Sequence, residues 1–146
     1  EIFAQSDYAP ARRLDSRVLV GSGVRSVIRD EEAFAFSIGN SLMFESERID
    51  AAPSAGHSDH TSVLRSSNYI NLRGSHGNAT ARFIAYYQFD ISAPSDARIL
   101  GDFELSTTII GPFEQTTSLR YRLDTEPPDD VENEDLHIGA SLGLNF

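Results

Sequence analysis

The chain has 146 residues, which suits a single domain, and 40% of them are hydrophobic. Its formal net charge is -10 at pH 7, and this excludes the usual nucleic-acid-binding protein, which holds phosphates with an excess of Lys and Arg. It has no cysteine, so disulfides and thiolate metal sites are excluded as well. No run approaches the roughly 18 apolar residues that predict a membrane-spanning helix.

Apolar residues recur at every second position in segment after segment, and Gly, Pro, Asn and Asp cluster between the segments. This period is typical of β-strands, whereas an amphipathic helix repeats every 3.6 residues or so. The pattern predicts an all-β fold with antiparallel neighbours in up-and-down order. The eight predicted strands are 1–8, 16–29, 34–48, 61–73, 80–92, 97–110, 115–124 and 135–146.

The connections between these strands are of two kinds. Up-and-down order places the short ones on one rim, together with both chain termini, and the longer and more polar ones mainly on the other rim. This asymmetry is typical of outer-membrane barrels. The short connections are 29–33, 74–78 and 111–114, and the opposite rim carries 9–15, 49–60, 92–96 and 125–135.

The alternation divides each predicted strand into an apolar and a polar face. The last strand shows this most clearly, because an apolar or small residue fills every second position from Leu136 to the terminal Phe146. The strand 61–73 shows it least, because Ser66 and Asn68 share a face with Ile70. Periodicity alone does not decide whether the apolar faces point into a soluble, lipocalin-like barrel or outward into lipid.

Opposite charges on the polar faces favour the membrane arrangement, because charges in a narrow lumen need partners. A hairpin closed at 111–114 would place Glu104 opposite Arg120 and Asp102 opposite Arg122, and closure near 93–95 would place Asp90 opposite Arg98. We therefore predict a charge network in the lumen. Its members are Arg82, Asp90, Arg98, Asp102, Glu104, Arg120 and Arg122.

Two further features favour a barrel whose apolar faces point outward into lipid and whose polar faces point into the lumen. Gly and Ser are frequent on the polar faces, where they would relieve crowding in a small barrel but would only weaken a solvated strand. Aromatic residues on the apolar faces lie toward strand ends, as in the girdles at headgroup level. These aromatic residues are Tyr8, Phe34, Phe36, Phe44, Phe83, Phe89 and Phe146.

The C-terminal third contains three short segments of note: Asp124-Thr125-Glu126-Pro127-Pro128, Glu134-Asp135 and the strand that ends with Leu142 to Phe146. In these segments it resembles the salt-stress-induced outer-membrane proteins of Gram-negative bacteria. The segment LDSRVLVGSGVRSVIRD also resembles a strand of that family. Thr125 departs from the family's usual Ser. The resemblance implies an outer-membrane barrel linked to envelope stress, and it supplies no catalytic residue. Family members carry about four more strands ahead of the matching region, so either the barrel has eight strands or these are the C-terminal eight of about twelve.

Other chemistry has weaker support. His57, Asp59 and His60 are candidate metal ligands in one loop, but no fourth ligand accompanies them. The loop TEPPDDVENED is rich in carboxylates but lacks the ligand spacing of a calcium-binding loop. No nucleophile motif such as G-x-S-x-G is present, so we predict no catalytic residues and no cofactor.

The sequence therefore predicts one domain, 1–146, that forms a transmembrane β-barrel in the bacterial outer membrane. Its expected partners are outer-membrane lipid, lipopolysaccharide and the barrel-assembly machinery, for which Leu142, Leu144 and Phe146 would form the C-terminal insertion signal. The expected role is structural or stress-associated, without catalysis. A small channel, if further strands widen the barrel, and a soluble ligand-binding barrel are the alternatives.

Overall fold

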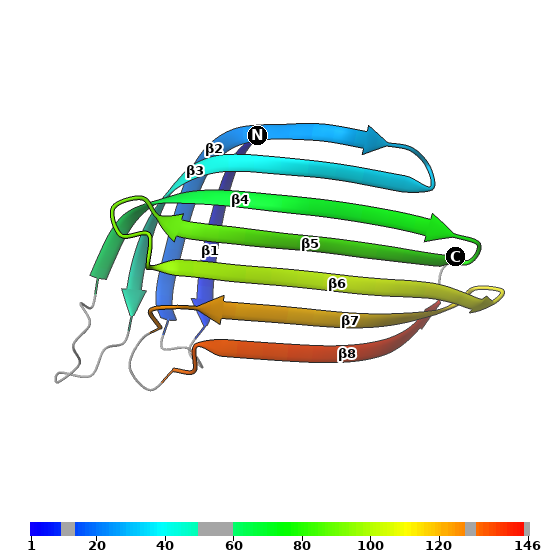
Figure 1. Cartoon of the computed structure of the whole chain (residues 1–146). Coiled ribbons are helices and arrows are strands. Elements are labelled where there is room, and N and C mark those ends of the chain that lie inside the picture. Colours follow the sequence, from blue (N-terminus) through cyan, green and yellow to red (C-terminus); the bar gives the residue numbers. More distant parts are fainter. Residues whose placement is uncertain (10–13, 50–59, 128–130, 145–146) are drawn as a thin grey trace.

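The fold is a single antiparallel sheet of eight strands in up-and-down order, as predicted (Figure 1). The computed structural model describes residues 1–9, 14–49, 60–127 and 131–144. Every strand end lies within three residues of its predicted position. The strands are β1 (Ile2–Ala9), β2 (Leu14–Asp30), β3 (Phe34–Ile49), β4 (His60–His76), β5 (Ala79–Asp90), β6 (Ala97–Ile110), β7 (Phe113–Asp124) and β8 (Glu134–Leu144).

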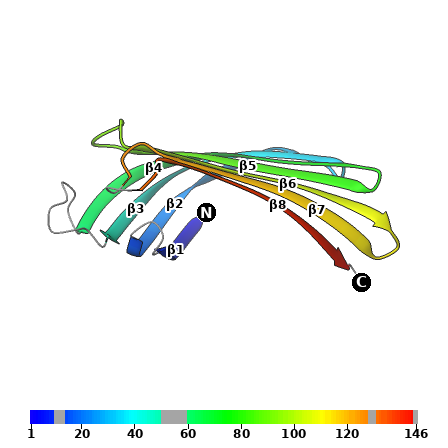
Figure 2. The same cartoon turned by 90° about the horizontal axis from the view of Figure 1, so that it is seen from below.

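The sheet is curled into a half-barrel, and β1 and β8 form its two edges (Figure 2). Seven pairings join consecutive strands. The edge strand β1 is short: Ile2 pairs with Ser22, halfway along β2, so β1 leaves the segment from Val24 to Asp30 without a partner on that side. Among the described residues no helix is long and apolar enough to cross a membrane.

The two rims differ as the sequence predicts. Short turns join β2 to β3, β4 to β5 and β6 to β7, and in the last two a glycine with positive φ, Gly77 or Gly111, begins a two-residue loop. The connections at the opposite rim are longer. The end of β8 lies at the short-turn rim, but the prediction for the N-terminus is wrong. Glu1 lies at mid-height, where its amino group donates to the carbonyl of Gly23.

The polar face is the concave, buried side of the sheet. Arg98 on β6 donates to Glu45 on β3, and such a bond between strands that are not neighbours can only cross the inside of the curve. Only four hydrophobic residues are buried among those described, whereas Glu45 and Arg65 are each 2% exposed. On the convex side, Val24 and Ile138 are each 71% exposed. The sheet thus has the reverse of the polarity expected for a soluble lipocalin-like barrel.

Candidate functional site

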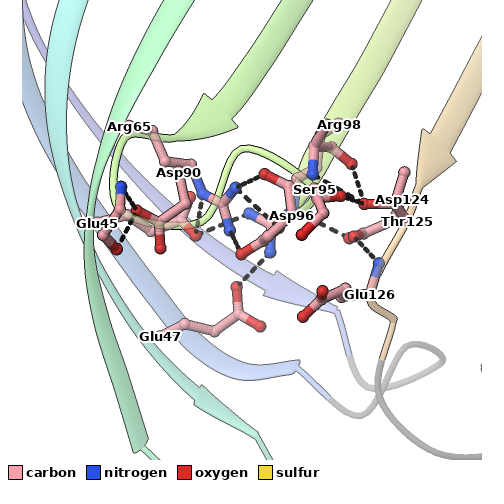
Figure 3. Close-up of polar contacts among 12 residues, drawn as sticks. Glu45, Glu47, Arg65, Asp90, Ser95, Asp96, Arg98, Asp124, Thr125 and Glu126 are labelled. Atoms are coloured by element: carbon pink, nitrogen blue, oxygen red, sulfur yellow. Dashed lines mark hydrogen bonds and ion pairs between the residues drawn. The ribbon is translucent and has the colours of Figure 1, made fainter.

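A group of buried and half-buried ionic side chains crosses the concave face near the long-loop rim (Figure 3). In it four guanidinium groups face four carboxylates, so its formal charges balance. We call it the charge cluster. Its members are Arg17, Glu45, Glu47, Arg65, Asp96, Arg98, Arg122 and Asp124.

Glu45 is the centre of the charge cluster. Its Oε1 accepts hydrogen bonds from Arg98 Nη1 at 2.7 Å and from Arg65 Nε at 3.3 Å, and its Oε2 lies 3.7 Å from Arg17 Nε. One carboxylate on β3 therefore joins arginines from β2, β4 and β6. Because the nearly buried carboxylate and guanidinium groups are out of water, each depends on the others for its stabilisation.

Arg98 extends the charge cluster toward the last strands. Its Nε donates to Asp124 Oδ2 at 2.9 Å, and its Nη2 donates to Glu47 Oε2 at 3.3 Å. Arg122 Nη2 donates to the same Asp124 oxygen at 2.9 Å. The contacts of Arg98 thus link β3, β6 and β7 across the inside of the curve.

The charge cluster also fixes the connection between β5 and β6. Arg65 holds Asp96 with two parallel bonds, Nη1 to Oδ1 at 3.0 Å and Nη2 to Oδ2 at 2.8 Å. This fork geometry is the strongest arrangement of an arginine with a carboxylate. Asp90 Oδ1 accepts from the backbone N–H and the hydroxyl of Ser92, both at 2.7 Å. Thr125 Oγ1 donates to the carbonyl of Ser95 at 2.7 Å, so the next connection at this rim is attached as well.

All buried polar side-chain atoms in the described residues have a hydrogen-bond partner. A fully satisfied buried network of this kind is rigid and specifies one arrangement of the strands that it joins. The arrangement is suited to filling the concave side of the sheet and to holding distant strands together.

The predicted lumen residues lie on the concave face but form more than one group. Arg98 and Arg122 belong to the charge cluster, and Asp90 lies beside it, opposite Arg65. The other four form two separate pairs in the more exposed half, toward the short-turn rim. These pairs are Arg82 with Glu104 at 2.9 Å and Arg120 with Asp102 at 2.7 Å.

The predicted cross-strand partners are wrong by two residues. Asp102 lies opposite Arg120 and Glu104 opposite Ser118, because the hairpin has a two-residue loop followed by an irregularity between Thr108 and Ile110. Likewise Arg98 lies opposite Gln88, not Asp90. A shift of two residues leaves every side chain on the same face, so the alternation cannot detect it.

Glycines on the concave face make room for aromatic rings. A Cβ at Gly39 would overlap the ring of Tyr69 on the neighbouring strand, and one at Gly21 would overlap Phe3. The Tyr69 ring also lies 5.4 Å, centroid to centroid, from that of Tyr86. Other glycines, such as Gly101, have no atom within 4 Å of the added Cβ. The sequence predicts that glycines relieve crowding inside the barrel, and in the structure this applies at Gly21 and Gly39 but not at every glycine.

The other predicted site residues are only partly described. His57, Asp59 and Phe146 lie outside the described residues. His60 begins β4, and its Nε2 lies 3.1 Å from Ser46 Oγ. Within the described ranges no group of three metal-ligating side chains is present. Leu142 and Leu144 lie on the edge strand β8 and are 75% and 54% exposed.

Six members of the charge cluster lie outside the predicted network, namely Arg17, Glu45, Glu47, Arg65, Asp96 and Asp124. The last two were the hardest to predict. Asp96 lies in a connection, where alternation carries no information, and Asp124 is the last residue of its strand. The sequence signal for Asp96 and Asp124 was their position beside strand ends at the same rim.

Comparisons of the chain with protein-family models, curated protein sequences and solved structures found no match.

Proposed function

We propose that the chain forms an integral outer-membrane β-barrel with a structural or envelope-stress-associated role and without catalysis. Outer-membrane lipid and lipopolysaccharide would surround it, and the barrel-assembly machinery would insert it. The resemblance of its C-terminal third to the salt-stress-induced outer-membrane proteins supports the same assignment.

The apolar convex face carries this proposal. One row of directly paired residues is apolar across six strands, from β3 to β8. An exposed apolar surface that continues from strand to strand is unfavourable in water and marks contact with lipid or another apolar surface. The row consists of Phe36, Leu72, Phe83, Phe103, Leu119 and Ile138.

The positions of aromatic residues support the same orientation. Phe34 and Phe113 begin β3 and β7 at the short-turn rim, and Tyr8 lies near the end of β1 at the other rim. All three are exposed. Aromatic rings at both ends of the strands are typical of the headgroup regions of a membrane barrel.

Two asparagines are among the polar residues on the apolar face. Asn40 and Asn68 lie opposite each other on β3 and β4, and Asn40 Nδ2 donates to Asn68 Oδ1 at 2.7 Å. Asn68 Nδ2 in turn donates to Ser66 Oγ at 3.2 Å. These bonds reduce the cost of the amides in an apolar environment, because the groups satisfy part of each other's hydrogen-bonding capacity.

Insertion requires that the sheet edges find partners, because unpaired backbone groups are costly in hydrocarbon. The proposal therefore includes pairing of β8 and of the open edge formed by β1 and residues 24–30 once the protein is in the membrane. The interior of an eight-stranded barrel is just wide enough for its own side chains. The charge cluster would occupy it near the long-loop rim.

A small pore is the second candidate, and a cavity on the concave face favours it. This cavity has a volume of about 600 Å³ and lies between the charge cluster and the short-turn rim. Its lining includes the polar side chains of Gln5, Ser41, Asn71 and Gln88. In a wider barrel the same side chains would line a water-filled path.

Insertion can be tested with two substitutions on one strand. Ile138→Arg puts a charge on the convex face of β8, and Ser141→Arg puts the same charge on the concave face. At the bilayer midplane a lipid-facing arginine costs about 2–4 kcal/mol. We expect Ile138→Arg to reduce the heat-modifiable, detergent-extracted form on gels, and Ser141→Arg to resemble the unchanged chain. Equal behaviour of both variants, or a monomer that stays folded in buffer without detergent, would contradict the proposal.

A further inference from the structure

Two arginines lie directly opposite each other on the concave face, near the short-turn rim. Arg73 on β4 pairs with Arg82 on β5 in the register of the sheet. Like charges at directly opposite positions repel each other and destabilise a strand pair. Elsewhere on the same face, arginines have carboxylate partners, as Arg120 has Asp102 at 2.7 Å. A counterion between Arg73 and Arg82 would therefore reduce their repulsion.

The protein supplies only part of that counterion. Arg82 Nη1 lies 2.9 Å from Glu104 Oε1 on the next strand. Arg73 Nη2 donates to the backbone carbonyl of Glu32 at 3.4 Å, and in the described part of the chain no carboxylate lies within ion-pair distance of it. Among the described residues, Arg25 on β2 reaches one carboxylate, that of Glu1, at 3.8 Å. Of the three arginines, Arg73 thus has a carbonyl but no carboxylate as its partner among the described residues, and Arg25 has one long ion pair.

These three arginines line one pocket. Its volume is about 330 Å³, and its lining also includes the hydroxyl-bearing Ser37, the amide-bearing Asn71 and the single carboxylate of Asp30. Hydrogen-bond donors therefore converge on the pocket from β2, β3, β4 and β5. Guanidinium groups match the oxygens of a phosphate in pairs, with charge-assisted bonds.

We propose that this pocket, which we call the arginine pocket, binds the phosphate group of a small solute that enters from the short-turn rim. A lipid headgroup could offer the same chemistry, but the arginines lie on the concave face, away from the apolar face. The site requires only the curled sheet and its side chains. It is therefore independent of whether the chain is inserted in a membrane.

The test is a titration of the full chain with inorganic phosphate, in the medium that keeps the chain folded, with chloride at matched ionic strength as reference. Binding would be followed by calorimetry and by NMR shifts of the arginine side chains. We expect phosphate but not chloride to bind. Arg73→Gln should weaken binding by about tenfold, since one charge-assisted hydrogen bond contributes roughly that factor.

Arg120→Gln is the matched control, because it removes the same charge from the same face outside the pocket. It should leave phosphate affinity unchanged. If Arg73→Gln does not fold, Arg73→Lys keeps the charge and should still weaken binding, because lysine lacks the paired donors. Equal loss in the Arg73 and Arg120 variants, or no saturable phosphate binding, would overturn the proposal. A response to phosphatidylglycerol in zwitterionic micelles without a response to phosphate would also overturn it.

Discussion

Glu45 shows how a single carboxylate can organise the inside of a sheet that has almost no apolar core. It is 2% exposed and accepts hydrogen bonds from arginines on two other strands. Among apolar neighbours a buried carboxylate of this kind would be costly. Here only four hydrophobic residues of the described chain are buried, so polar pairing replaces apolar packing in the interior.

Replacing Glu45 with Gln should destabilise the folded chain strongly. The substitution preserves the shape but leaves Arg65 and Arg98 with one buried carboxylate fewer. Removal of one partner from a buried ion pair costs about 3–5 kcal/mol. The free energy of unfolding, measured by urea titration in detergent or lipid, would test this.

Glu104→Gln provides the control. Its pair with Arg82 is largely exposed, with side-chain exposures of 43% and 60%, so its loss should cost less than about 1 kcal/mol. Similar losses for the two variants would mean that burial gives the charge cluster no special role.

At the scale of the strand, alternation predicted the elements and their faces well but could not predict their partners. The bounds of β6 match the prediction residue for residue, because polar and apolar positions alternate along most of it. The predicted register of β6 with β7 was wrong by two residues. The register depends on an irregularity near Ile109, which the pattern of side chains does not predict. Hairpin geometry, rather than hydrophobicity, decides that part of the fold.

The contact between β3 and β4 gives a prediction at the same scale. Gly39→Ala should weaken the sheet by about 1–3 kcal/mol, because the added methyl group would overlap the Tyr69 ring. The same change at Gly101 meets no neighbouring atom and serves as the control. Thermal or urea unfolding of both variants would measure the difference.

A second variant identifies the cause. In a Tyr69→Ala background the ring is gone, so the additional cost of Gly39→Ala should largely disappear. A cost that persists in this background would point to the backbone of β3 and would contradict the role assigned to the ring.

For the whole molecule, the sequence predicted the up-and-down order, the rims and the polar interior. It did not predict the half-barrel form of the described sheet or the way in which the charges gather. The charge cluster joins residues from five strands and from the connection before β6, and this convergence depends on curvature, which no local pattern encodes. The aspartate at position 96 is the clearest example, because it lies outside every strand.

The position of the charge cluster predicts how the protein would behave in a planar bilayer. We expect little or no conductance from the unchanged chain, because buried side chains cross the concave face near one rim. Removing both partners with Glu45→Ala and Arg98→Ala should increase conductance while keeping the net charge. Arg82→Ala with Glu104→Ala, a pair in the open half, should change it little. Equal currents from both double variants would contradict a plug formed by the charge cluster.

The sequence separation of the contacts suggests an order of folding. All seven strand pairings join consecutive strands, so each needs only the closure of a short or moderate loop. The bond between Arg98 and Glu45 spans 53 positions and needs β3 to β6 already in place. We therefore expect hairpins to form while these side chains are still hydrated. The loss of that hydration then coincides with the curling of the sheet, which makes ion pairing the final step of assembly.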